Sequence, residues 1–103
     1  VVRELLKHGA DAVVCPNDHI AAGVLKACSR LGVRVPEDLA VTGYDDVDFC
    51  QFLTPSLTTF YGNNELAART AVELLLKLMN NPSLPAKERS VILSPVFIER
   101  EST

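Results

Sequence analysis

Short continuous apolar runs alternate along the chain with segments in which apolar residues follow helical spacing. Extended segments are predicted at Ala12 to Cys15, Leu39 to Gly43 and Leu57 to Tyr61. The first is rich in β-branched residues, which is typical of a strand buried in a parallel sheet. Between the first two segments, apolar residues recur with helical spacing at Ile20, Val24, Cys28 and Leu31. This order predicts an α/β fold with parallel strands joined by right-handed crossovers.

Residues that begin or end helices mark the limits of these elements. Asn17 and Asp18 are good N-caps for a helix from His19 to Leu31, which Gly32 ends. After a turn at Gly62–Asn64, a long helix is predicted from Glu65 to about Asn80. Its expected buried face consists of Ala67, Ala71, Leu74, Leu75 and Leu78. A final strand, from Val91 to Glu99, contains Pro95, which removes a ladder donor and predicts an edge or a bend.

Length and charge exclude several classes of protein. With 103 residues, the chain forms one domain or part of one. The net charge is −3 and there is no cluster of basic residues, so we expect no nucleic-acid binding by this chain alone. No apolar run approaches the roughly 20 residues that span a bilayer. Because the sequence begins inside a predicted helix and without Met, we expect a fragment of a longer protein.

Cysteine usage indicates a reducing compartment. Cys15, Cys28 and Cys50 are odd in number and widely spaced, and none forms a C-x-x-C pair. Such a set is typical of buried, reduced thiols in the cytoplasm rather than of a disulfide framework. We therefore expect a cytoplasmic protein.

Polar residues follow the first two predicted strands, at the end where α/β sheets bind ligands. Asp45 follows the second strand, and its carboxylate can accept two hydrogen bonds from the vicinal hydroxyls of a sugar. Asn17 offers both a donor and an acceptor, although it serves equally well as a helix cap. For Asp18 and Asp46, a capping or buried structural role is favoured over ligand contact. Together these residues predict a small-molecule site.

Two further residues are candidates for ligand contact, and other kinds of site can be considered for the same acids. Tyr61 can stack on a sugar face, and Asn64 follows the same strand, although a partly buried tyrosine is the commoner case. Asp45, Asp46 and Asp48 lack the Gly and the distal Glu of a calcium loop, so no metal site is predicted. No nucleophile–base pair and no phosphate-binding loop is visible. We therefore expect a binding protein without a cofactor rather than an enzyme.

Four sequence motifs resemble the lactose-repressor/galactose-repressor (LacI/GalR) family of bacterial transcription regulators. The first, D-A-x-x-x-x-N-D-x-x-A-x-G, corresponds to residues 11–23, and the second, G-x-x-V-P-x-D-x-x-V-x-G-[FY]-D-D, corresponds to residues 32–46. The third, P-x-L-T-T, lies at residues 55–59, and the fourth, the closing L-I-x-R-x-S-T, at residues 97–103. Each motif is weak alone, but all four occur in the family's order and spacing. Phe60 departs from the usual Val or Ile.

The resemblance implies an α/β parallel-sheet sandwich of the periplasmic-binding-protein-like (type I) fold. Residues 1–103 would then form most of the C-terminal lobe of the effector-binding domain, without its first strands, the N-terminal lobe or the DNA-binding headpiece. The implied partners are a sugar-like effector, which the family contacts at the positions of Asp45 and Asn17, and operator DNA through the headpiece. The implied state is a homodimer that buries one side of the second helix, at Ala22, Leu25 and Ser29.

Two alternatives remain open at this point. A periplasmic sugar-binding protein of a transporter shares the two-lobed fold, but the unpaired cysteines and the paired G-Y-D-D and L-T-T motifs argue against it. A magnesium-dependent phosphoryl-transfer or receiver domain would use Asp18, Asp45 and Asp46. No Lys or Thr at a following strand end clearly completes such a pocket, so this alternative is the weakest.

Overall fold

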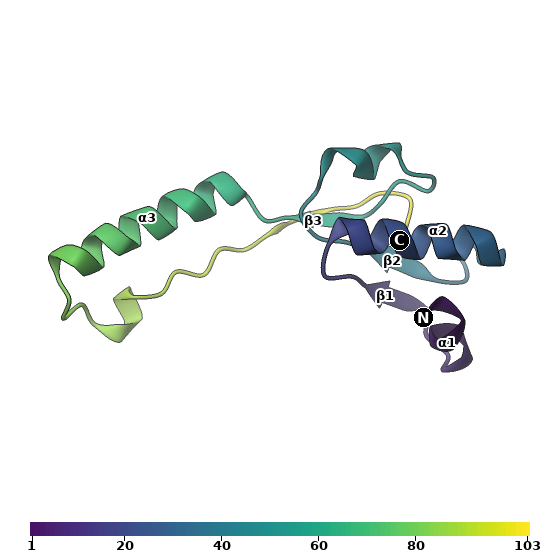
Figure 1. The fold of residues 1–103 in the computed structure, drawn as a ribbon, viewed down its shortest axis with the longest axis horizontal. Helices are drawn as coiled ribbons and strands as arrows, with labels where there is room; N and C mark the ends of the chain where they lie inside the picture. The colour runs from purple at the N-terminus through teal and green to yellow at the C-terminus, as the bar shows by residue number, and fades with distance from the viewer. The chain divides into compact units, whose positions relative to one another are not determined.

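The computed structural model describes residues 1–103 and consists of two compact units (Figure 1). The first unit contains residues 1–61 and 97–103, and the second contains residues 62–96. The chain therefore passes from one unit to the other after Tyr61 and returns after Val96. The predicted α/β class with parallel strands is confirmed. That all 103 residues belong to one lobe stays a prediction.

The first unit is built on a parallel strand–helix–strand arrangement. Its elements are α1 (Val2–Lys7), β1 (Ala12–Val14), α2 (Asp18–Leu31), β2 (Ala40–Thr42), the 3-10 helix η1 (Asp48–Phe52) and β3 (Thr59–Tyr61). β1 and β2 pair in parallel with Val13 opposite Val41, and Thr42 forms a parallel bridge with Thr58. The three predicted extended segments therefore lie side by side, and their carboxyl ends share one edge.

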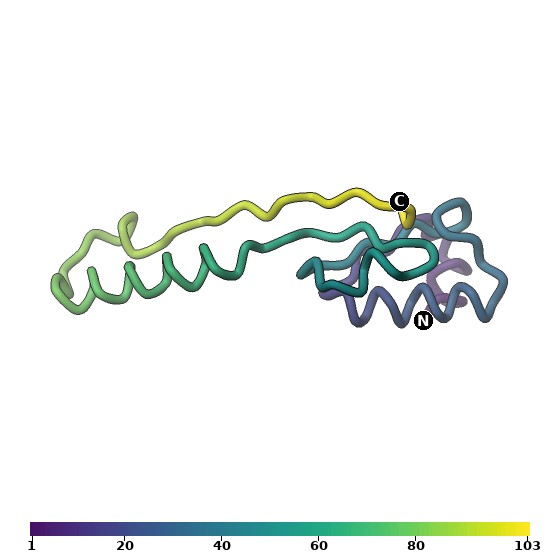
Figure 2. Tube along the Cα trace, turned by 90° about the horizontal axis from the view of Figure 1, so that it is seen from above, coloured from purple at the N-terminus to yellow at the C-terminus, as the bar shows by residue number.

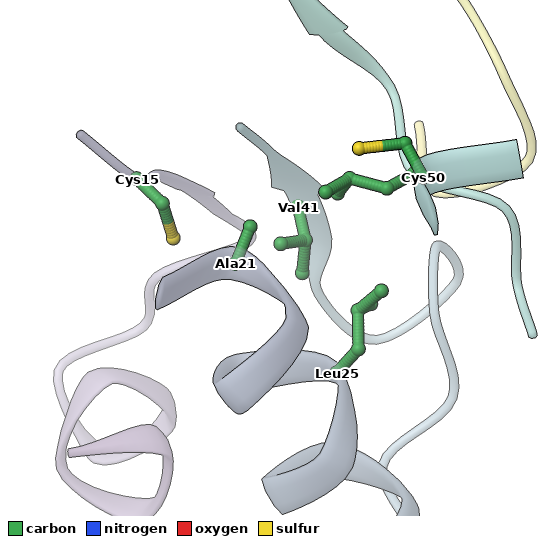
Figure 3. Close-up of a cluster of buried hydrophobic side chains, with 6 residues drawn as sticks. Cys15, Ala21, Leu25, Val41 and Cys50 are labelled. Carbon is green, nitrogen blue, oxygen red and sulfur yellow. The ribbon is translucent and has the colours of Figure 1, made fainter. Parts of the chain in front are cut away.

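Helix α2 covers the strands with its small and apolar face. Ala21, Leu25 and Cys28 are buried and follow helical spacing. Figure 3 shows Ala21 and Leu25 directed toward Val41 of β2. Ile20 was predicted on this face, but it is 49% exposed. It precedes Ala21 by one residue, which turns its side chain by about 100° around the helix and away from the sheet.

All three cysteines are free and buried, as predicted. Burial raises the pKa of the Cys15 and Cys28 thiols above its usual value, because the thiolate loses solvation inside the core. These side chains therefore pack as small apolar groups.

A C-terminal strap, residues 100–103, fastens the loop before β3 to β2. Ser102 is fully buried, and its hydroxyl donates to the Val41 carbonyl at 2.6 Å and accepts from the Thr58 amide at 2.8 Å. The Val41 amide donates in turn to the Ser102 carbonyl. The strap follows β4 (Val96–Ile98), which pairs with β3. The predicted strand from Val91 to Glu99 was expected to be interrupted at Pro95, and only the part after Pro95 forms a strand, because proline has no amide to donate to a ladder.

The second unit consists mainly of helix α3 (Asn64–Asn80), the 3-10 helix η2 (Ala86–Glu88) and an extended segment that runs back beside α3 (Figure 2). The Asn63 side chain caps α3 by accepting from the Leu66 amide at 3.1 Å, as the predicted turn with a cap requires. Apolar residues of both segments line a shallow groove of about 320 Å³, among them Ala67, Ala71, Leu74, Val91 and Leu93. No helix in residues 1–103 has the length and apolarity needed to cross a membrane.

The predicted buried face of α3 is not observed. None of its residues is buried in this unit, and Leu75 is 56% exposed. Ala67, Leu74 and Leu78 are half-buried. Within residues 62–96, only the returning extended segment lies along the helix, so most of the apolar face lacks a covering element.

The turn before β2 provides a pH-dependent test of the fold. The Arg34 guanidinium, through its hydrogen bond to Asp38, lowers the pKa of that carboxyl from 3.8 to about 2, and the Arg34 amide adds a second bond at 2.9 Å. Because the folded-state pKa lies below the unfolded one, this contribution to stability is present above pH 3.8 and is lost as the pH falls through 2. An NMR titration of Asp38 should therefore show a midpoint near 2. Arg34→Gln should raise it toward 3.8, whereas a wild-type midpoint near 3.8 would rule out the pairing.

Candidate ligand-binding site

The two polar strand ends meet in the structure. Asn17 and Asp18 follow β1, and Asp45 and Asp46 follow β2. The Asp18 amide donates to the Tyr44 carbonyl at 3.0 Å, which joins the start of α2 directly to the loop after β2. The prediction that both strand ends converge on one edge is therefore confirmed for the backbone.

Asp18 is a fully buried acid that connects three elements. Its Oδ1 accepts from the Thr59 hydroxyl of β3 at 2.5 Å, and its Oδ2 accepts from the Val47 amide at 2.9 Å. Asp18 is also the first residue of α2, where the helix dipole favours a negative charge. These partners compensate the cost of burying the carboxylate. The structure thus gives Asp18 the buried structural role that the sequence favoured.

Gly43 makes this burial possible. A Cβ at Gly43 would lie 2.1 Å from Asp18 Oδ1 and 3.2 Å from the Asp18 Cα. These distances are shorter than van der Waals contact, so only glycine leaves room for the carboxylate beside β2. Close packing against Asp18 therefore explains why the G-Y-D-D motif begins with glycine.

Cys50 of η1 completes the surroundings of the buried acid. Burial, followed by a hydrogen bond with Asp18, raises the pKa of the Cys50 thiol to about 12. Cys50 therefore stays protonated at neutral pH and is a poor nucleophile.

Asp45 and Asp46 have unusual backbone conformations and different surroundings. Their φ angles are 108° and 51°, in the region that non-glycine residues rarely adopt. The Asp45 amide donates to the Phe60 carbonyl at 2.9 Å, but its side chain is exposed and makes no hydrogen bond within the chain. The Asp46 carboxylate instead accepts from Arg100 Nη2 at 2.7 Å. Of the two acids, only Asp45 therefore has a carboxylate that is exposed and without a partner within the chain.

The other predicted site residues divide between the two units. Asn17 caps α2 by accepting from the Ile20 amide at 2.9 Å, and its side-chain amide nitrogen has no partner within the chain. Tyr61, at the end of β3, is 39% exposed. Asn64 belongs to the second unit, where it is the first residue of α3 and exposed. Ligand contacts by these residues and by Asp45 and Asp18 stay predictions.

Sequence reasoning missed three features of this edge. Thr59 was not recognised as the partner of Asp18, although hydroxyl residues in a segment predicted to be a strand were a signal. Arg100 was not recognised as the partner of Asp46, because 54 residues separate them. The third feature is an aromatic row next to Asp45, in which the Phe60 ring lies 6.3 Å from Tyr44 and 5.0 Å from Phe97.

The side of α2 predicted for dimerisation lines a groove. Ala22, Leu25 and Ser29 border this groove of about 420 Å³, together with Lys26, Arg30, Leu53 and Thr54. Leu25 is 6% exposed and contributes to the core, whereas Ser29 is exposed. Among residues 1–103, no three His, Cys, Asp or Glu side chains lie together as a metal site.

The whole sequence matches one protein family. The sequence profile described as "Periplasmic binding protein-like domain" matches residues 1–103. The chain belongs to this family. The ribose operon repressor of Escherichia coli (strain K12) is 35% identical over 103 residues, which cover 98% of this chain and 31% of that protein. The predicted resemblance to LacI/GalR regulators is thereby confirmed.

Solved structures of LacI-family regulators support the same assignment. A regulator from Arthrobacter sp. FB24 in complex with lactose is 39% identical, with a TM-score of 0.78 over 98% of this chain and 38% of its own. The lac repressor dimer bound to operator is 29% identical, with a TM-score of 0.81 over 97% of this chain and 35% of its own. The periplasmic-binding-protein-like fold is therefore confirmed. The chain spans about a third of the length of these relatives.

Gly43→Ala tests the packing of the buried acid. In the full-length protein we expect it to lower the free energy of unfolding by about 1–3 kcal/mol, the usual cost of overpacking a core. Gly23→Ala is the matched control, because Gly23 lies in α2 with nothing within 4 Å of its Cβ position. This control should raise the stability by about 0.5–1 kcal/mol. Urea denaturation measures both, and equal stabilities of Gly43→Ala and wild type would contradict the geometry.

Proposed function

We propose that the chain is the effector-sensing part of a LacI/GalR-type transcription regulator, and that its effector is a sugar. The observation that carries this proposal is the exposed and unpaired Asp45 carboxylate at the carboxyl end of β2. The neighbouring acids, Asp18 and Asp46, are both satisfied within the chain. One free acid on a rigid strand end suits a neutral polyol better than a cation.

The chemistry of this edge fits sugar hydroxyls. Asp45 can accept two hydrogen bonds from vicinal hydroxyls, and the free amide nitrogen of Asn17 can donate to a third oxygen. Tyr61, which is 39% exposed, offers an aromatic ring for stacking. In this proposal, Asp18 holds the site in place through Thr59 and Val47 and makes no ligand contact itself.

In the proposed mechanism, effector binding selects between two states of a homodimer. The effector would favour one orientation of the two lobes of the full-length protein, and that orientation would change the spacing of the DNA-binding headpieces. The side of α2 that carries Ala22, Leu25 and Ser29 would bind the partner subunit. The resemblance to the lac repressor dimer bound to operator supports this assembly. The proposed location is the cytoplasm, where operator DNA lies.

The alternatives have less support. A magnesium-dependent receiver would need Asp18 open to the ion, but its carboxylate is fully buried and hydrogen-bonded to the chain. A transport receptor outside the cytoplasm would share the fold, but the relatives described above are regulators of transcription. We therefore propose a non-enzymatic regulator.

Asp45→Ala tests the ligand site. In the full-length protein it should weaken sugar binding by about 1.5–3 kcal/mol, which is roughly a 10- to 100-fold rise in Kd. Isothermal titration calorimetry with D-ribose, D-glucose, lactose and sucrose measures the effect on whichever sugar wild type binds most tightly. Asp48→Ala, which changes an exposed acid at the start of η1, is the control and should leave Kd unchanged. An unchanged Kd for Asp45→Ala would show that the site is elsewhere.

Ala22→Glu tests the dimer surface. It replaces a methyl group with a long, charged side chain in the groove along α2, which a partner subunit packed there would have to bury, so it should shift the full-length protein from dimer to monomer. Ala86→Glu, at an exposed position in η2, is the control. Light scattering after size-exclusion chromatography measures the molar mass of wild type and of both variants, loaded at equal protein concentration. A dimer as stable as wild type would remove this side of α2 from the interface.

A further inference from the structure

Arg100 connects three segments that are far apart in the sequence. Its backbone amide donates to the Thr58 hydroxyl at 2.8 Å, and its Nη1 donates to the Leu57 carbonyl at 2.8 Å. Its Nη2 donates to Asp46 Oδ1 at 2.7 Å. The guanidinium therefore fixes the loop after β2 against the segment that leads into β3.

The ion pair with Asp46 is shielded from solvent. The Arg100 and Asp46 side chains are only 20% and 25% exposed. The other ion pairs of the chain lie on the surface, with at least one partner more than 60% exposed. A charge-assisted hydrogen bond in a partly buried position resists screening by water and salt. This pair is therefore suited to holding a local conformation.

The conformation that needs holding is that of the two adjacent acids. Asp45 and Asp46 both have positive φ, which costs free energy in any residue with a Cβ and persists only when surrounding contacts impose it. Three contacts impose it here. The Asp45 amide bonds to Phe60, the Asp46 carboxylate bonds to Arg100, and the Val47 amide bonds to Asp18. Only the Asp46 contact pairs two charged side chains.

The ion pair between Arg100 and Asp46 also gives the two adjacent acids different roles. Arg100 neutralises Asp46 and leaves the Asp45 carboxylate without a partner. Without Arg100, two neighbouring carboxylates would repel each other, and the backbone would relax toward negative φ. Asp45 would then point elsewhere, although the residue itself is unchanged.

We propose that Arg100 is a positioning residue for ligand binding, which acts through Asp46 to fix the conformation of Asp45. This inference rests on the proposed function, in which Asp45 contacts the sugar. It gives the Arg of the C-terminal strap a role in affinity in addition to its contribution to the fold.

Calorimetry on the full-length protein tests the proposal, with the sugar of the panel above that wild type binds most tightly. Arg100→Gln should raise Kd about tenfold, as expected for the loss of one well-oriented hydrogen bond to ligand. Arg100→Lys, which keeps the charge opposite Asp46, should recover part of this loss. In an Asp45→Ala background, Arg100→Gln should cause no further rise, because the group that it positions is gone. Arg34→Gln removes a surface pair with Asp38 and should leave Kd unchanged.

The outcomes separate the two claims. If Asp45→Ala raises Kd and Arg100→Gln does not, the role of Arg100 is wrong and the ligand site stands. Additive effects of the two substitutions would also overturn the role of Arg100. If Asp45→Ala leaves Kd unchanged, both claims fail together.

A crystal structure of Arg100→Gln gives a readout that does not depend on ligand. We expect Asp45 and Asp46 to leave positive φ, and an unchanged loop would overturn the proposal. If Arg100→Gln does not fold, Asp46→Ala removes the carboxylate that accepts from Arg100. We expect it to raise Kd and to let the loop leave positive φ in the same way.

Discussion

The buried carboxylate of Asp18 is the interaction on which the rest of the site depends. It joins the start of α2 to β3 through Thr59 and to the loop after β2 through Val47. An acid without solvent is stable only if every partner stays in place, so its burial fixes three elements relative to one another. Position 43 requires glycine because the Asp18 carboxylate occupies the space that a Cβ at this position would need. Asp18, to which we assign no ligand contact, thus fixes the edge of the sheet that carries the proposed contact Asp45.

The two threonines of the L-T-T motif, Thr58 directly before β3 and Thr59 within it, bond to different parts of the structure. Because side chains alternate along a strand, Thr58 and Thr59 face opposite ways. Thr59 bonds to Asp18, and Thr58 bonds to Arg100 and Thr103 of the C-terminal strap. The loop that carries Asp45 and Asp46 is therefore held from one side by the buried acid and from the other by the strap. The Asp45 carboxylate, which none of these side chains contacts, stays exposed, as the proposed sugar contact requires.

Features that depend on residues close in the sequence could be predicted well, whereas contacts between residues far apart in the sequence could not. The limits of α2 follow from the Asn17 cap and from Gly32, so they could be predicted within one residue. The convergence of Asp18 and Asp45 followed from parallel topology. The pairing of Arg100 with Asp46 could not be predicted, since no periodic pattern relates residues so far apart. The positive φ of Asp45 and Asp46 was equally hidden, because long-range contacts impose it. The apolar residues of α3 could be recognised from their spacing, but their predicted burial was wrong, because no residue of this helix is buried.

The central claim is that Asp45 binds a sugar while Asp18 supports it from the interior. A crystal structure of the full-length protein with the sugar that it binds tests this claim most directly. The account predicts ligand hydroxyls within hydrogen-bond distance of the Asp45 carboxylate, with the Asp18 carboxylate still bonded to Thr59 and Val47 and out of contact with the ligand. A sugar bonded to Asp18, or bound away from the carboxyl ends of β1 and β2, would contradict it.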